Sequence, residues 1–382
     1  MALNRRTLLL GAGAGLAAWA CSTRPARFAT PTLETGARVR DVRVHDGTWW
    51  ACGSVLGDDG VHSPRLWRGA APEQLAPVTL APISFYGERS ELYSIGVGAL
   101  GLVAIGAQSG GFHAMPRSAS WVLDGDVLRE VDATAELFGG PSSLALVQAC
   151  AGSQFVLIGS RVDRRTGRSG ACVWTSPDGT AFTILDDVPG LRAEEGEQSE
   201  ALGVAAGPDG SFVAAGDGFA TSGTDTTTHA LAWTASDPSA WDRASVPADP
   251  HGGRTSMTCV AAGPSGLLAG GTLSRNGATT LCVWSCVDGT AWSMAPIGGL
   301  ATAVTNTVSA VTALTHDGAS WWLGGRLGTT PVLATSRDLR AWYRRSLPPT
   351  APASAQVRVA VDGRLLVAIS DLDHAATYTW PA

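Results

Sequence analysis

The sequence contains no lysine, so all 27 of its basic residues are arginine. The use of arginine in place of lysine throughout is typical of a GC-rich coding sequence. The formal net charge is −6, and the chain therefore lacks the positive excess that a general nucleic-acid binder needs on one face. No Cys-x-x-Cys pair and no His/Cys cluster occurs, which excludes the usual spacing of zinc ligands. We predict no metal, no cofactor and no nucleic-acid partner.

Sustained helical periodicity is also missing. Gly and Pro, with 47 and 21 copies, interrupt every stretch before a 3.6-residue period is established. Residues 92–112 carry no charge and could suggest a membrane span, but such glycine-rich runs make poor spanning helices. We read this run as two strands. Helical solenoids are excluded.

What the sequence does contain is a repeat with a period of about 50 residues. Each copy has an apolar strand that ends in Gly, a polar loop, a short strand that usually ends in Trp, and a turn into a last strand. Seven units of four short strands predict an all-β fold, a seven-bladed β-propeller with four-stranded antiparallel blades. The strand-ending residues are Gly53, Gly106, Gly159, Gly216, Gly271, Gly325 and, in the seventh copy, Ser370. The Trp landmarks are Trp67, Trp121, Trp174, Trp233, Trp284 and Trp380, with Ala334 in the sixth copy.

The two ends of the repeat are complementary. The seventh copy stops at Ala382 before a fourth strand, and residues 26–35 precede the first complete unit without a partner there. We expect this N-terminal strand to pair with the last blade, which closes the ring and removes two exposed sheet edges. Residues 26–382 then form one propeller domain, which we expect to be a monomer.

The first 20 residues are predicted to be a signal peptide, because a charged start is followed by a short apolar stretch and a small-residue exit. The pair Arg5-Arg6 followed by Thr-Leu-Leu resembles a twin-arginine export signal. That route carries folded proteins, which suits a propeller. With the arginine-only basic set, this signal favours an actinobacterial type of protein.

The junction Ala18-Trp19-Ala20-Cys21 resembles a lipobox, after which Cys21 would be lipidated. Ala18 and Trp19 depart from the usual pattern. The same residues also fit ordinary signal cleavage, which would leave a soluble secreted protein starting at Cys21. We favour an extracytoplasmic lipoprotein that touches the membrane only through its lipid anchor, with residues 21–25 as a tether.

Six further cysteines lie in the propeller domain. In an oxidising compartment their even number permits disulfides, but their places on first and third strands do not favour direct bridges within a blade. We expect most of them to be small buried hydrophobic residues. They are Cys52, Cys150, Cys172, Cys259, Cys282 and Cys286.

Four turns between third and fourth strands share a Ser-x-Asp-like motif followed by an aromatic residue. They read SPDGTAF (176–182), ASDPSAW (235–241), CVDGTAW (286–292) and SRDLRAW (336–342). This motif resembles the Asp-box of sialidases and related BNR-repeat propellers, with one residue fewer between Asp and Gly. We expect a structural role, because the Asp can accept backbone N–H bonds and the ring can pack between blades.

If the resemblance to sialidases extended to their activity, it would imply an arginine triad, an acid/base Asp and a Tyr nucleophile with a Glu partner. The sequence does not offer that set. The nearest candidates are Arg65 in Ser-Pro-Arg-Leu, and Tyr86 with Glu88 and Glu91 in one inter-blade loop. Neuraminidase activity is therefore not predicted.

Function is expected on the face formed by the loops between second and third strands together with the inter-blade loops. Arginine forks there could hold an anionic glycan or an acidic partner, and exposed loop residues without a ligand are the alternative. The candidate ligand-binding residues are His62, Arg65, His113, Arg117, Arg161, Arg165, His229, Arg275, Arg326 and His374. We predict a non-catalytic, envelope-associated propeller that binds a protein or cell-wall carbohydrate; the alternative is a glycan-acting hydrolase or lyase of sialidase-like ancestry.

Overall fold

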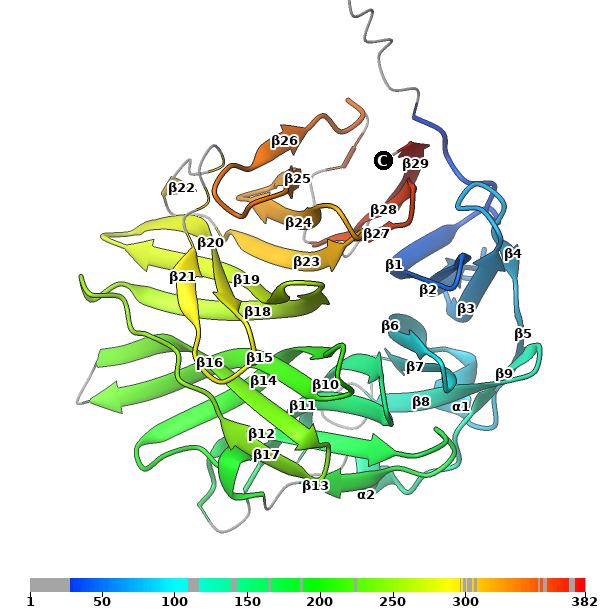
Figure 1. The fold of residues 1–382 in the computed structure, drawn as a ribbon. Coiled ribbons are helices and arrows are strands. Elements are labelled where there is room, and N and C mark those ends of the chain that lie inside the picture. The colour runs from blue at the N-terminus through cyan, green and yellow to red at the C-terminus, as the bar shows by residue number, and fades with distance from the viewer. Residues whose placement is uncertain are drawn as a thin grey trace, which may run out of the picture.

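Seven antiparallel sheets surround one axis in the computed structural model (Figure 1). The structure describes residues 28–108, 117–138, 143–163, 166–185, 188–222, 225–295, 297, 300, 304–305, 308–349, 351–352, 356–370 and 375–381. Each sheet is one blade, and apart from the added β5 (Thr79–Ala81) and β22 (Val304–Thr305) its strands follow one another from the axis outwards in chain order. The predicted seven-bladed β-propeller is confirmed.

The first three blades occupy the N-terminal part of the chain. Blade 1 contains β1 (Ala37–His45), β2 (Thr48–Leu56), β3 (His62–Gly69) and β4 (Ala76–Pro77). Blade 2 contains β6 (Glu91–Gly98), β7 (Gly101–Gln108), β8 (Arg117–Asp124) and β9 (Val127–Glu130), with β5 (Thr79–Ala81) parallel to β9. Blade 3 contains β10 (Ser143–Ala151), β11 (Phe155–Val162), β12 (Ser169–Ser176) and β13 (Thr183–Leu185).

The remaining blades repeat the pattern. Blade 4 contains β14 (Glu197–Ala206), β15 (Phe212–Ser222), β16 (Asp225–Asp237) and β17 (Ala240–Arg243). Blade 5 contains β18 (Arg254–Gly263), β19 (Gly266–Arg275), β20 (Ala278–Cys286) and β21 (Ser293–Ala295), and β22 (Val304–Thr305) also pairs with β20. Blade 6 contains β23 (Ala310–His316), β24 (Trp321–Leu327), β25 (Thr330–Ser336) and β26 (Tyr343–Arg345). Blade 7 contains β27 (Gln356–Val361), β28 (Arg364–Ser370) and β29 (Ala375–Pro381).

In the described residues, helical turns occur only in connections between these strands. They are α1 (Phe85–Glu88), α2 (Ala135–Phe138) and the 3-10 turn η1 (Pro189–Leu191). Among the residues that the structure describes, no helix has the length and apolarity needed to cross a membrane. The uncharged run that could suggest a span forms β6 and β7 as far as residue 108, as expected.

The ring closes where the sequence predicts. Ala29 N–H donates to Thr379 O at 3.0 Å, and Thr379 N–H donates to Ala29 O at 2.8 Å, so the N-terminal segment pairs with the free edge of β29. The ring of Phe28 contacts that of Trp380 edge-on, with centroids 5.0 Å apart. Within the described residues the pairing is a single bridge rather than a continuous ladder, and it occupies the fourth-strand position of blade 7.

The strand-ending glycines have a steric cause. In blades 1 to 6 the first strand carries a β-bulge opposite its second strand. The bulge brings a first-strand carbonyl against the glycine: a Cβ on Gly53 would lie 1.7 Å from Arg38 O, and one on Gly271 would lie 1.7 Å from Ser256 O. In blade 7 no register shift interrupts the pairing of β27 with β28, and Ser370 stands in the equivalent place.

The hydrophobic core lies between neighbouring blades. One cluster joins blades 5 and 6, and another joins blades 4 and 5 around Trp284 and Trp292. The landmark tryptophans of the third strands are buried in all six blades that have one. All six propeller cysteines are free thiols, and five of them are buried, which confirms the expectation for most of them.

The four Asp-containing turns are built as their motif predicts. Asp288 Oδ1 accepts from Thr290 N–H at 3.0 Å and from the Thr290 hydroxyl at 2.7 Å, and the Trp292 ring is buried. Asp178 makes the same contacts with Thr180. The carboxylates are engaged within their own turns, which agrees with the expected structural role of these segments.

Candidate ligand-binding site

The predicted ligand-binding residues of blade 1 are held by neighbouring side chains. His62 Nδ1 lies 2.9 Å from Ser54 Oγ, and that hydroxyl donates to Glu91 Oε1 at 3.0 Å. Arg65 Nε pairs with Glu34 Oε1 at 3.2 Å, in the segment that precedes β1. These contacts tie blade 1 to blade 2 and to the N-terminal segment.

In blades 4 and 5 the predicted residues are also engaged. His229 Nε2 lies 2.6 Å from Glu197 Oε1, and Arg243 donates to the same carboxylate at 2.7 and 2.9 Å. Burial opposes ionisation of Glu197, yet the hydrogen bonds from His229 and Arg243 hold its pKa well below the usual value. Arg275 Nε donates to Asp249 Oδ2 at 2.7 Å.

The other predicted residues are spread around the ring. Arg117 begins β8 and lies over the ring of Tyr86, while Arg161 and Arg326 lie on the second strands of blades 3 and 6. The structure thus brings His62, Arg65 and Arg117 to the junction of blades 1 and 2, and separates them from His229 and Arg275. Their ligand-binding role stays a prediction. Arg5, Arg6, Cys21, His113, Arg165 and His374 lie outside the described residues.

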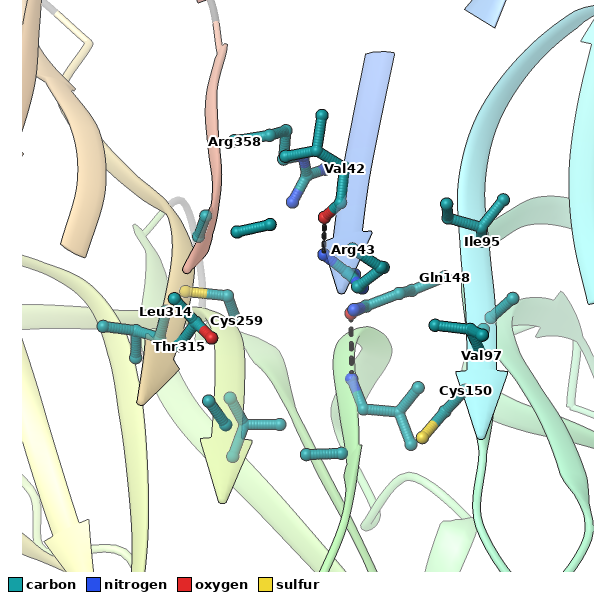
Figure 2. A pocket seen from close by; sticks show the side chains of 18 of the residues that line it. Val42, Arg43, Ile95, Val97, Gln148, Cys150, Cys259, Leu314, Thr315 and Arg358 are labelled. Atoms are coloured by element: carbon teal, nitrogen blue, oxygen red, sulfur yellow. Dashed lines mark hydrogen bonds between the residues drawn. The ribbon is translucent and has the colours of Figure 1, made fainter. Parts of the chain in front are cut away.

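A cavity of about 230 Å³ lies on the propeller axis, lined by consecutive residues from the first strands of all seven blades. Figure 2 shows Arg43, Gln148 and Arg358 reaching into it from three different blades. Most of the remaining lining is small and apolar, because seven strands crowd together at the axis. Two of the described residues that line this cavity carry a charged side chain, Arg43 and Arg358, and both charges are guanidiniums.

The cavity guanidiniums are partly neutralised. Arg43 Nη1 donates to Asp41 Oδ1 at 2.9 Å and to Val42 O at 3.1 Å, while Arg358 Nη1 donates to Thr312 O, a backbone carbonyl. Asp41 is 1% exposed and does not line the cavity. One carboxylate beside two guanidiniums leaves a net positive charge at the axis.

Polar side chains that come just after the bulges accept hydrogen bonds from the backbone of the neighbouring first strand. Asp41 Oδ2 accepts from Ile95 N–H at 3.1 Å, and Gln148 Oε1 accepts from Val204 N–H at 3.0 Å (Figure 2). Ser94 Oγ accepts from Ala149 N–H at 3.1 Å. The backbone of the axial strands is thereby fixed, and the cavity has a preformed wall.

The thiols of the cavity are not set up for nucleophilic chemistry. Burial raises the pKa of Cys150 to about 11 and that of Cys259 to about 12, although the charges of Arg43 and Arg358 oppose the shift. Both thiols are therefore protonated near neutral pH. Among the described parts of the chain, no group of three or more His, Cys, Asp and Glu side chains is placed to hold a metal.

A carboxyl pair lies in blade 4, away from the cavity lining. Glu200 on β14 pairs directly with Asp217 on β15, so their side chains share one face of the sheet. Asp217 accepts from Ser256 Oγ at 2.8 Å and from Met257 N–H at 3.0 Å. Burial, together with the charge of Glu200, raises the pKa of Asp217 to about 7, and burial also raises that of Glu200.

The axial residues were not predicted from the sequence, because function was expected on the loop face and none was assigned to the first strands. A signal was available in the repeat itself. At the positions of Arg43 and Arg358, the corresponding residues of the other blades are mostly Gly, Ala or Val. A charged residue that departs from the other copies on an inner strand marks the axis as a candidate site.

No family model matches the chain, and no curated protein matches it in sequence. Solved structures do resemble it. Virginiamycin B lyase from Staphylococcus aureus has a TM-score of 0.54 at 10% identity, over 93% of this chain and 99% of that chain. The PL25 polysaccharide lyase Ulvanlyase has a TM-score of 0.54 at 11% identity, over 92% and 94%. Puromycin hydrolase has a TM-score of 0.50 at 12% identity, over 90% of this chain and 52% of that chain. At these identities the likeness concerns the propeller fold alone.

Proposed function

We propose that the protein is a non-catalytic propeller that binds an anionic group of an envelope protein or cell-wall carbohydrate in its axial cavity. The observation that carries this proposal is the charge of the cavity lining, where Arg43 and Arg358 are the charged side chains among the described residues. Guanidiniums bind carboxylates and sulfates through paired, charge-assisted hydrogen bonds. A volume of about 230 Å³ suits one terminal group, because whole ligands of drug size need larger pockets.

The chemistry of the lining supports binding over catalysis. A general base near neutral pH is most often an imidazole or a carboxylate within hydrogen-bond reach of the reacting group. The described lining of the cavity contains neither, and its two thiols are protonated. The polar side chains that remain, two guanidiniums, an amide and the hydroxyl of Thr315, can orient and hold a ligand.

The experiment is a calorimetric titration of the purified protein with D-glucuronate, with D-glucose as the uncharged control. The Arg358→Gln variant should bind glucuronate roughly 10- to 100-fold more weakly, because a hydrogen bond to a charged group contributes roughly 1.5–3 kcal/mol. Arg344→Gln on β26 is the matched control, since Arg344 is exposed at the outer edge of blade 6. Equal affinity of the wild type and Arg358→Gln would remove the basis of the proposal.

The proposed location is the outer side of the cell membrane, reached by twin-arginine export and held by lipidated Cys21. Palmitate labelling of cells should mark the wild type and spare a Cys21→Ala variant. Labelling of neither protein would favour the secreted soluble alternative. Crosslinking in the envelope, carried out on the same cells, identifies the partner.

The alternative, a glycan-acting hydrolase or lyase, has one specific observation in its favour. Glu200 and Asp217 form a carboxyl pair whose pKa values are raised, as in acid/base catalysts. Against it, Asp217 is only 7% exposed and both of its oxygens are engaged. Release of reducing ends or unsaturated sugars from acidic polysaccharides, abolished in Asp217→Asn, would support this alternative.

A further inference from the structure

The inter-blade loop before β6 presents three large hydrophobic side chains to solvent. Ile83, Phe85 and Tyr86 are 62%, 57% and 37% exposed. They are three of the seven exposed large hydrophobic residues in the described part of the chain, and they lie within four consecutive positions. Clustered exposure of this kind marks an interaction surface more often than scattered single residues do. We call Ile83, Phe85 and Tyr86 the aromatic platform.

The platform is held rigidly by a carboxylate from the neighbouring strand. Glu130, the last residue of β9, accepts from Ile83 N–H at 2.7 Å, from Ser84 N–H at 2.9 Å and from the Ser84 hydroxyl at 2.5 Å. Ser84 Oγ in turn caps α1 by accepting from Gly87 N–H at 2.8 Å. A Cβ on Gly87 would lie 2.0 Å from Glu130 Oε2, so a larger residue there would displace this carboxylate. The exposed rings are therefore preorganised.

Two guanidiniums flank the rings without a carboxylate partner in the described residues. Arg89 Cζ lies 4.6 Å from the centroid of Phe85, and Arg117 Cζ lies 5.9 Å from that of Tyr86. The two rings stand nearly perpendicular, with centroids 5.7 Å apart. By contrast, Arg65 of the same region is paired with Glu34.

A cleft of about 450 Å³ adjoins the platform, and Pro82 and Glu88, on either side of the two rings in sequence, belong to its lining. Arg65 also lines it, which places a predicted ligand-binding residue beside the platform. This volume falls within the range of small-ligand clefts. Contacts of α1 with β3, β7 and β8 put the platform at the junction of blades 1 and 2 (Figure 1).

We propose that this junction is a subsite for an anionic polysaccharide, in which Phe85 and Tyr86 stack against sugar rings while Arg89 and Arg117 hold their carboxylates or sulfates. A pyranose has an apolar face of C–H groups that suits an aromatic ring, and the flanking guanidiniums complement a negative substituent. A neutral glycan would leave both guanidiniums unused. The ligand class, an anion, is taken from the proposed function of the axial cavity, and the proposal rests on that function to this extent. The aromatic platform is a different surface from the cavity.

The test is a titration of the full-length mature protein with oligogalacturonate and with its methyl ester, in which the charge is masked. The wild type should bind the acid form and bind the ester at least tenfold more weakly. Phe85→Ala/Tyr86→Ala and Arg89→Gln/Arg117→Gln should each weaken binding of the acid form at least tenfold. Tyr343→Ala is the matched control, because Tyr343 is 66% exposed on β26 and should leave affinity unchanged.

Two outcomes separate this inference from the proposed function. Unchanged oligogalacturonate affinity in both double variants would overturn the subsite, whereas glucuronate binding that depends on Arg358 would still support the axial cavity. Self-association of the wild type that is lost in Phe85→Ala/Tyr86→Ala, measured by sedimentation, would also overturn the subsite, because the platform would then be a contact between two copies. Circular dichroism confirms that each variant is folded.

Discussion

Asp217 makes the stability of this propeller depend on pH. The residue is 7% exposed, and burial raises the pKa of its carboxyl from 3.8 to about 7, with the charge of Glu200 acting in the same direction and that of His229 opposing it. A raised folded-state pKa means that the native state holds a proton that the unfolded chain releases. The resulting stabilisation is fully present below the unfolded pKa and is lost as pH rises through 7.

The magnitude follows from the shift. Each pKa unit corresponds to about 1.4 kcal/mol, so Asp217 alone should lower the free energy of unfolding by roughly 4 kcal/mol between pH 4 and pH 7.5. Urea denaturation between pH 5 and pH 8 measures most of this range and avoids the acid limb, where Glu197 acts in the opposite sense. The Asp217→Asn variant should show a flatter profile than the wild type and should gain relative stability above pH 7. Parallel profiles for the two proteins would refute the assignment.

Three further predictions concern the scaffold and the axis. Gly271→Ala should destabilise the protein by roughly 1–3 kcal/mol or more in urea, because the new Cβ would meet a backbone carbonyl at 1.7 Å; an unchanged midpoint would contradict the steric account of the bulge. Glu197→Gln should cost roughly 1–3 kcal/mol, since it removes the buried carboxylate partner of Arg243 and leaves it only the exposed Glu194, and equal stability of variant and wild type would show that the pair is dispensable. Cys150 and Cys259 should resist iodoacetamide at pH 8 in the folded protein and react in urea, because their pKa values of about 11 and 12 keep the thiols protonated; rapid labelling of the native protein would contradict this.

The blade landmarks could be predicted from sequence because each is enforced locally and repeated. A bulge in the first strand leaves no room for a side chain at Gly53 or Gly271, so the residue recurs with the period of the blade. The closing strand could also be predicted, because the third strand of blade 7 has a free edge and the segment near Ala29 has no partner in blade 1. These inferences need only a pattern within the chain.

The partners of the predicted ligand-binding residues could not be obtained in this way. Arg65 pairs with Glu34, and His229 and Arg243 share Glu197, across separations of about 30 to 46 residues. No periodicity selects one carboxylate among the 33 acidic residues as the partner of a given arginine. A loop arginine therefore looks the same in the sequence whether it holds the scaffold together or faces a ligand.

This difference gives a rule for ordering the arginines of the propeller. An arginine that shares a buried carboxylate, such as Arg243 on Glu197, has its charge neutralised and its removal should first affect stability. Arg358, which donates to a backbone carbonyl, and Arg89 and Arg117, which lie against aromatic rings, retain charge that the described residues do not balance. A ligand of opposite charge gains most from this second group. Substitutions there should reduce binding while stability stays close to that of the wild type, which separates the two groups in a single set of variants.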